Sequence, residues 1–421
     1  NMITIPEGVE VTLTGGTIKN EVAAAKPAKY GVWDNDAENR TMFHVDGKLT
    51  INGGTYQTAG VHMMRVSGTA VIGGSATLEC TATQAQFSAA DNYDGAPLIS
   101  VTGKGAELTI ADATINANKG NGTTDGMYGI YVNYGGKLVL GVKDGEAVKA
   151  PTITSQLAAI AMNGTTSPGT IVIEGGNYTS YAACTDSSVV KFNSVLYLPA
   201  TANVTIKGGT FTAAGTQGPS HVISVPYNVD PQASKVKVRL NLVINGGTFN
   251  VNFSATEKKV FFDAGMEDTA EGEETANRIS IRGGVFNCEP KPAYVAGCHA
   301  VTKDNEENPT TWTVGDEIAG AHRLTWVARK KSTCWEEGVI GHYECLKCHR
   351  MYKTKTSAEE LSLEAAAIPR EEHGASENVE EVPAQLATCT EPGNERYFKC
   401  TKCDLCYETV QQLEADEKGT G

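Results

Sequence analysis

A short phrase recurs along the first two-thirds of the chain: an alternating apolar and polar strand, then Gly-Gly, a small residue and an aromatic or aliphatic one. The clearest copies are Val11–Ile18, Leu49–Tyr56, Ile171–Tyr178, Val204–Phe211, Leu242–Phe249 and Ile279–Phe286. A phrase that returns in this way is the signature of a solenoid, in which each repeat stacks on its neighbours. The repeat therefore constrains the fold before any single residue is considered.

A second short apolar strand precedes the Gly-Gly strands. Its copies are Met42–Val45, Leu98–Val101, Ile130–Val132, Ala159–Met162, Val195–Leu198, Val222–Val225 and Val260–Phe262. Alternation with period two turns one side of each strand inward and the other outward. Two strands per repeat with a third, variable side predict an all-β fold, a right-handed parallel β-helix of about nine coils between Met2 and Phe286. Weaker copies complete the series at Val71–Ile72, Leu108–Ile110 and Leu138–Leu140.

The Gly-Gly pairs are typical of corners, where the chain needs positive φ or a close approach of backbones. They are not dinucleotide-binding loops, because no helix follows them. We expect corner geometry, rather than ligand contact, to explain most of the 45 glycines.

Charge and hydropathy exclude two classes of partner. The 35 basic and 49 acidic residues give a net charge of −14, without the basic stripe that nucleic-acid binding requires. No apolar run reaches the roughly 18 residues of a membrane span, so we expect no membrane insertion. The chain opens on the strand-like Met2–Ile5, and we expect any signal peptide or wall anchor to lie outside this sequence.

Segments of variable length follow the Gly-Gly corners, and such one-sided insertions usually build the recognition surface of a solenoid. Aromatic side chains in a polar rod favour sugar stacking or protein contact. For Tyr128 the alternative is strand alternation, with its ring in the core. The candidate ligand-binding residues are Trp33, Asp34, Asp36, Asp91, Tyr93, Asp94 and Tyr128.

A carbohydrate-active enzyme, either a polysaccharide lyase or a glycoside hydrolase, is the alternative function. Such enzymes need two carboxylates about a bond, or a base with Ca²⁺ or Arg. The acidic candidates, Asp125 among them, lie in turns or loops, where Asp is common for conformational reasons. We therefore expect a protein that is not an enzyme and that binds a host or environmental glycan or surface protein.

The composition changes after about residue 315. Seven of the 11 cysteines fall between Cys334 and Cys406, and two segments align at an offset of 55 residues. Both contain C-x10-C-x2-C, which are Cys334/Cys345/Cys348 and Cys389/Cys400/Cys403. We predict a β-helix domain with its cap over residues 1–315 and two Cys/His modules over residues 316–370 and 371–421.

Each module has the ligand set of a structural zinc site, because C-x-x-C presents two thiolates and a distant Cys and one further N or S ligand complete a tetrahedron. For the first module the further ligand is His322, with His342 or His349 as alternatives; for the second it is His373 or Cys406. Disulfides are the rival interpretation, since secreted proteins favour them. We expect Cys80 and Cys184 to be small core residues. Cys288 and Cys298 could form a disulfide or be two buried thiols.

Two segments resemble parts of surface proteins of gut Firmicutes. Gly283–Phe286, Tyr294–Cys298 and Thr311–Val314 resemble the C-terminal cap of β-helices related to pectin-lyase-like domains, and residues 322–410 resemble His-and-Cys zinc-ribbon-like repeats. The second resemblance implies that the leading His of each module, His322 or His373, is a ligand. Together they imply a secreted or cell-wall-attached bacterial surface protein that serves as an adhesive or recognition stalk.

Overall fold

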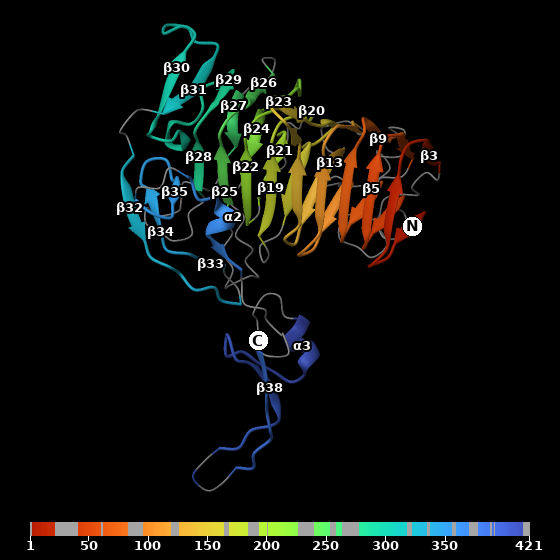
Figure 1. The fold of residues 1–421 in the computed structure, drawn as a ribbon, viewed down its shortest axis with the longest axis vertical. Coiled ribbons are helices and arrows are strands. Elements are labelled where there is room, and N and C mark those ends of the chain that lie inside the picture. The colour runs from red at the N-terminus through yellow and green to blue at the C-terminus, as the bar shows by residue number, and fades with distance from the viewer. Residues whose placement is uncertain are drawn as a thin grey trace. The chain divides into compact units, whose positions relative to one another are not determined.

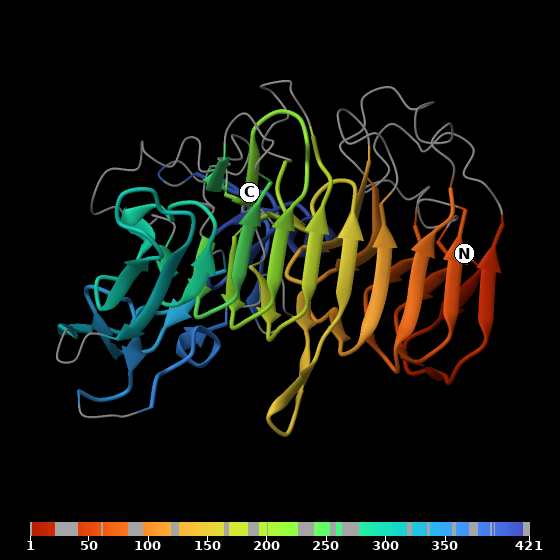
Figure 2. The ribbon, with the colours of Figure 1, turned by 90° about the horizontal axis from the view of Figure 1, so that it is seen from above.

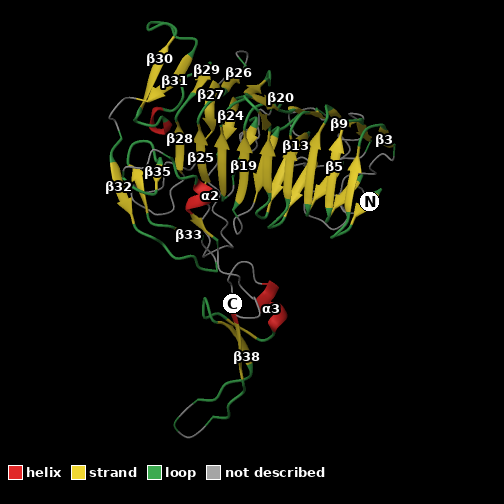
Figure 3. Cartoon of the chain, in the orientation of Figure 1, coloured by secondary structure: helices red, strands yellow, loops and turns green. Residues whose placement is uncertain are grey.

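The computed structural model describes residues 2–21, 41–59, 62–82, 96–118, 126–163, 168–183, 193–199, 201–225, 240–252, 258–262, 278–317, 322–334, 337–355, 359–369, 378–387, 390 and 392–415. The chain divides into two compact units; strands dominate the first, and the second has short strands joined by loops (Figure 3). The first unit comprises residues 1–228 and 238–321, and the described part of the second comes from residues 322–415. No helix among the described residues is long and apolar enough to cross a membrane.

The first unit is the predicted parallel β-helix, with nine coils and three long sheets (Figure 1). The first sheet consists of β1 (Ile3–Ile5), β4 (Phe43–Val45), β7 (Met64–Val66), β10 (Ala96–Thr102), β13 (Met127–Asn133), β18 (Ile160–Asn163), β21 (Leu196–Tyr197), β24 (Ser220–Ser224) and β27 (Lys258–Phe262). The second consists of β2 (Glu10–Leu13), β5 (Lys48–Asn52), β8 (Thr69–Gly73), β11 (Glu107–Ile110), β14 (Lys137–Leu140), β19 (Gly169–Ile173), β22 (Ala202–Ile206), β25 (Leu240–Ile244) and β28 (Arg278–Ile281).

The third sheet adds a strand that the sequence did not predict. In most coils it begins at or directly after a Gly-Gly corner, so the nine coils have three strands each rather than two and a variable side. Its members are β3 (Thr17–Asn20), β6 (Thr55–Thr58), β9 (Ala76–Cys80), β12 (Ala113–Ala117), β17 (Thr152–Ser155), β20 (Asn177–Ser180), β23 (Thr210–Ala213), β26 (Thr248–Val251) and β29 (Gly284–Phe286), followed by β31 (Trp312–Glu317) and β30 (His299–Lys303).

The Gly-Gly corners are required by the spacing of the coils, as the last one shows. Gly284 has a φ of 127°, which residues with a Cβ rarely adopt. A Cβ on Gly283 would lie 2.4 Å from the carbonyl oxygen of Asn245 in the coil before. Corner geometry therefore explains these residues, as the sequence predicted.

The solenoid core contains a continuous aromatic stack. Tyr178, Phe211, Phe249 and Phe286 follow four successive Gly-Gly corners and pair in register between β20, β23, β26 and β29. Successive ring centroids lie 4.9, 5.0 and 4.8 Å apart, and the rings are within 17° of parallel. Parallel strands repeat at about 4.8 Å, so one aromatic residue per coil at a fixed position produces stacked rings.

The outward face of the third sheet carries a row of small polar side chains. In register across eight coils it reads Thr17, Thr55, Thr77, Thr114, Thr152, Asn177, Thr210 and Thr248. β-branched residues suit a strand face that meets water on one side. The outer surface is thus set by the same period-two alternation that fills the core.

The parallel stacking ends in an antiparallel cap. β31 pairs antiparallel with β29 and with β30, after the short 3-10 helix η3 (Pro292–Tyr294). Asp304 organises the β30–β31 connection by accepting hydrogen bonds from the Thr310 and Thr311 N–H groups at 2.9 and 3.0 Å. Capping removes an open sheet edge, and the segment is the one for which the sequence predicted a cap.

A second hairpin, β15 (Val142–Asp144) with β16 (Ala147–Lys149), is inserted between the second and third strands of one coil. It projects beyond the strands of its coil, where the yellow ribbon extends farthest down in Figure 2. All six of its strand residues are exposed.

The second unit contains two copies of one small antiparallel sheet. β32 (Leu324–Val327), β34 (His342–Cys345) and β35 (Met351–Tyr352) form the first, and β37 (Val379–Val382), β38 (Tyr397–Cys400) and β39 (Cys406–Tyr407) form the second. Each strand lies 55 residues from its counterpart, so the sequence duplication is also a structural one. The remaining elements are β33 (Gly338–Val339), which pairs with β36 (Ala367–Ile368), and the helices α2 (Leu363–Ala366) and α3 (Val410–Ala415).

Candidate metal centres

Each small sheet of the second unit has a C-x-x-C turn between its last two strands. His349 and Asp404 occupy equivalent places just after these turns and have φ values of 57° and 65°. His and Asp are among the side chains that adopt this conformation most readily after Gly. In both turns the residue after the second Cys donates its N–H to the carbonyl of the first, at 2.8 Å from His349 to Cys345 and 2.9 Å from Asp404 to Cys400. The two turns, which we call knuckles, are therefore built alike.

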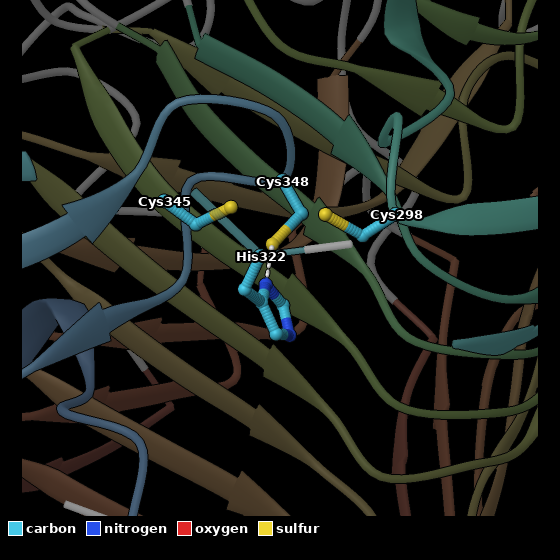
Figure 4. Close-up of side chains that lie close together, drawn as sticks. All are labelled: Cys298, His322, Cys345 and Cys348. Carbon is cyan, nitrogen blue, oxygen red and sulfur yellow. Dashed lines mark hydrogen bonds between the residues drawn. The ribbon is translucent and has the colours of Figure 1, made fainter. Parts of the chain in front are cut away.

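The first cluster joins His322 to the first knuckle. The donor atoms of His322, Cys345 and Cys348 lie within 4.8 Å of one another, and both cysteines are buried (Figure 4). Nδ1 of His322 lies 3.3 Å from Sγ of Cys348. Tetrahedral zinc with Zn–S of about 2.3 Å and Zn–N of about 2.0 Å places N and S ligands ~3.5 Å apart. The cluster therefore has nearly the separation that a shared ion requires.

Local hydrogen bonds favour the thiolate of Cys345. Burial raises the pKa of this thiol, but hydrogen bonds from His322 and from the N–H groups of Lys347, Arg323 and Cys348 outweigh it and lower the pKa to about 6. One of them, from Arg323 N to Cys345 Sγ, is 3.4 Å long. Since the thiolate is the form that binds metals, the knuckle prepares Cys345 to be a ligand.

The second cluster contains Cys334, Cys400 and Cys403, whose sulfur atoms also lie within 4.8 Å of one another. The Sγ atoms of Cys334 and Cys400 are 3.8 Å apart, too far for a disulfide of about 2.05 Å. The same distance fits two thiolates on one tetrahedral zinc, which lie ~3.8 Å apart.

The thiols of the second cluster perturb one another. Burial, and then the neighbouring Cys403 and Cys400, raise the pKa of Cys334. The pKa of Cys400 is lowered although burial raises it, because backbone N–H groups and the other two thiols donate to its sulfur. A cation would remove this conflict, since a coordinating thiol is deprotonated outright.

The sequence grouped Cys334 with the first knuckle, and in the structure it lies with the second. The prediction used the spacing between cysteines within each copy of the module. Such spacing does not determine which of the two copies the loop with Cys334 contacts. His373 and Cys389 lie outside the described residues. Cys406 is exposed and does not belong to the second cluster.

The alternative ligands of the first module have another partner. Nδ1 of His349 lies 2.6 Å from the carboxylate of Glu344, and Nε2 of His342 lies 3.7 Å from it. Glu344 is buried beside Cys345 in β34. Sequence reasoning did not single out Glu344; its place next to a ligand, in a strand with inward alternation, was the only signal. Of the three histidines considered, His322 is the one that joins the cysteines.

No disulfide forms among the described cysteines. Cys80 is buried in the solenoid core, as predicted, and Cys184 lies outside the described residues. Cys288 and Cys298 form no disulfide, and Cys298 is buried whereas Cys288 is half-buried. Burial raises the pKa of Cys288 to about 11, with a smaller opposing effect of Lys258. The bridge between them is therefore absent, and of the alternative, two buried thiols, only Cys298 is fully buried.

The predicted ligand-binding residues are placed less completely. Trp33, Asp34, Asp36, Asp91, Tyr93 and Asp94 lie outside the described residues. Tyr128 is 2% exposed and packs edge-to-face on Tyr131 at 5.7 Å. Its ring therefore fills a small apolar cluster beside the solenoid rather than a surface, because at this coil both faces of β13 are buried.

Fold and clusters together define a parallel β-helix protein whose C-terminal unit carries Cys/His groups that could hold metal ions. Comparison with protein-family models, with curated proteins and with solved structures finds no match to this chain.

Proposed function

We propose that this chain is a secreted or cell-wall-attached bacterial surface protein whose β-helix is a stalk that binds a glycan or a surface protein of a host or of the environment. In this proposal the protein is not an enzyme. Zinc has a structural role, with one ion at His322, Cys345 and Cys348 and one at Cys334, Cys400 and Cys403.

The observation that carries the binding proposal is where the long connections lie. Third-sheet strands are joined to the next first-sheet strands through residues 21–42, 81–95, 118–126 and 181–195, which differ widely in length. Connections from second to third sheet are mostly two or three residues, as at 53–54 and 207–209. A scaffold with constant coils and variable segments on one corner suits a binding surface that varies without disturbing the core.

Three glutamates on the strands of the second sheet, or directly after them, pair with lysines. Glu10 pairs with Lys48 at 3.1 Å, Glu107 with Lys137 at 3.4 Å, and Glu174 with Lys207 at 2.5 Å, in each case one coil apart. Each acid thus has a cation rather than a second acid as its neighbour. A glycosidase needs two carboxylates facing one bond, so these pairs favour a structural part for these residues.

Zinc is supported by the chemistry of the donors. Thiolates and imidazole in near-tetrahedral spacing are the usual ligands of structural zinc, whereas Ca²⁺ and Mg²⁺ take oxygen ligands. A unit of small two- and three-stranded sheets also has little core of its own. Zinc would supply folding free energy that apolar burial cannot.

A glycan array and a panel of extracellular proteins, probed with the intact chain, test the binding proposal. The informative variant replaces residues 22–40 by a short Gly-Ser linker. The control deletes the β15–β16 hairpin, which is inserted at another corner, between the second and third sheets. We expect the first change to weaken binding at least tenfold and the control to preserve it. Binding that survives the first change, and a corresponding change at residues 83–95, would refute the proposed surface.

A degradation screen on pectins, mucin glycans and plant polysaccharides tests the alternative. We expect no turnover by the parent chain. Cleavage that is lost when Asp34, Asp36, Asp91, Asp94 or Asp125 is replaced by Asn would establish a carbohydrate-active enzyme instead.

A further inference from the structure

The second cluster combines residues from both copies of the duplicated sheet. Cys400 and Cys403 come from the knuckle of the second copy, but Cys334 precedes β34 of the first. The residue that matches Cys334 at the 55-residue offset is Cys389, so a site confined to one copy would have used Cys389 with Cys400 and Cys403.

The loop that carries Cys334 has a closed base. Lys330 and Val339 exchange two backbone hydrogen bonds of 2.9 Å each, and Cys334 lies between them in the sequence. A Cβ on Gly338 would lie 2.5 Å from the carbonyl oxygen of Lys330, so this base depends on glycine. The second copy repeats the device between Gln385 and Asn394, also with two bonds of 2.9 Å.

Closure makes the loop a small independent finger rather than part of its own sheet. β33, at the end of the finger, pairs with β36 and not with β32, β34 or β35. Among the described residues of the finger, therefore, no strand pairing holds its cysteine to the knuckle at Cys345 and Cys348.

The surroundings of Cys334 belong to the second copy. It is 3% exposed, and its apolar cluster contains Cys400, Tyr407 of β39 and Leu413 of α3. Phe398 and Val379 pack against the same cluster. A thiol so enclosed, 3.8 Å from a second thiol, is in the setting of a buried ligand rather than of a reactive surface cysteine.

We propose that Cys334 of the first copy and Cys400 and Cys403 of the second bind one zinc ion together, so that this ion ties the two copies of the sheet to each other. The inference rests on the zinc binding proposed above and adds that one ion connects the two copies. In this arrangement the two copies of the sheet are cross-linked by a metal ion and do not fold as two separate modules. Chelation would therefore separate the copies from each other as well as loosen each knuckle.

The deciding experiment removes one knuckle at a time in the full chain and then asks which remaining ion needs Cys334. In Cys345→Ser/Cys348→Ser the remaining ion belongs to the second knuckle, and adding Cys334→Ser should abolish it. In Cys400→Ser/Cys403→Ser the remaining ion belongs to the first knuckle, and adding Cys334→Ser should leave it in place. Zinc per chain is measured by elemental analysis, and Co²⁺ substitution reports thiolate ligation through sulfur-to-cobalt absorption.

The opposite pattern, in which Cys334→Ser removes the ion of the first knuckle only, would overturn the shared site while leaving zinc binding intact. A parent chain that binds no zinc would instead overturn the proposal that zinc is present at all. Cys406→Ser is the matched control, because this exposed thiol lies near the second knuckle but outside the cluster, and it should change neither ion.

A measurement on the unsubstituted chain covers variants that fail to fold. Metal-free protein treated with a mild thiol oxidant should form a disulfide from Cys334 to Cys400 or Cys403, mapped by mass spectrometry, and added zinc should suppress it. Linkage of Cys334 to Cys345 or Cys348 would refute the inference.

Discussion

The aromatic stack of the solenoid should be a local centre of stability. Phe211 is fully buried, with Tyr178 at 4.9 Å on one side and Phe249 at 5.0 Å on the other. Phe211→Ala removes the ring from both neighbours, and a buried Phe→Ala change costs about 3–5 kcal/mol. Stacking contributes part of this, about 0.5–1.5 kcal/mol for each ring pair. Phe211→Leu should cost less than Phe211→Ala, because it also loses both ring pairs but leaves a smaller cavity.

Hydrogen exchange followed by mass spectrometry measures the effect coil by coil. A solenoid couples mainly to nearest neighbours, so protection should fall around β20, β23 and β26 and stay unchanged in the first coil, β1 to β3. A loss of 3–5 kcal/mol would accelerate exchange by roughly 10²- to 10³-fold or more, since each 1.4 kcal/mol is tenfold.

The matched control is Thr212→Ala, because this neighbour points outward from the same strand and should change stability by about 0.5 kcal/mol or less. Two results would refute the reasoning. One is a Phe211→Ala protein no less stable than the control; the other is a loss of protection that is equal in the first coil, which would mean that the stack is not a local device.

Three further outcomes are expected. Gly283→Ala should lower the melting temperature, because its Cβ would meet the carbonyl oxygen of Asn245 at 2.4 Å, whereas Gly315→Ala, with nothing within 4 Å, should not; equal melting temperatures would contradict the corner argument. Hydrogen bonds from Thr310 and its neighbour lower the pKa of Asp304 to about 2, so its support of the cap hairpin is complete above the unfolded pKa of 3.8 and is lost as the pH falls from there through about 2. Amide exchange in the hairpin should therefore rise over that window, and Asp304→Asn should remove the pH dependence. Chelation should increase proteolysis of the second unit and spare the solenoid, and equal cleavage of both units would argue against structural zinc.

Short-range patterns in the sequence determined most of the fold. The alternation in Leu242–Ile244 and its counterparts predicted which side chains face inward, and the Gly-Gly pairs predicted the corners, because both depend on geometry within a few residues. The ligand pairs of the knuckles were predictable for the same reason, since C-x-x-C fixes two sulfur atoms by local spacing. Of the three histidines considered as a ligand of the first module, His322 is the one that lies beside those cysteines.

Only the tertiary structure determined which residues far apart in the sequence come into contact. Tyr128 was weighed as a surface residue or a core residue, and packing against Tyr131 placed it in the core. Cys334 has the same spacing to its knuckle as Cys389 has to the other, so nothing in the pattern tells one copy of a duplicated sheet from its twin. Two tertiary features place Cys334 with the second copy. One is the loop that backbone hydrogen bonds close between Lys330 and Val339, and the other is the apolar cluster around Cys400, 66 residues further along the chain. Sequence spacing fixes chemistry within a turn, whereas a contact across a duplication is fixed by backbone closure and burial, which exist only once the chain has folded.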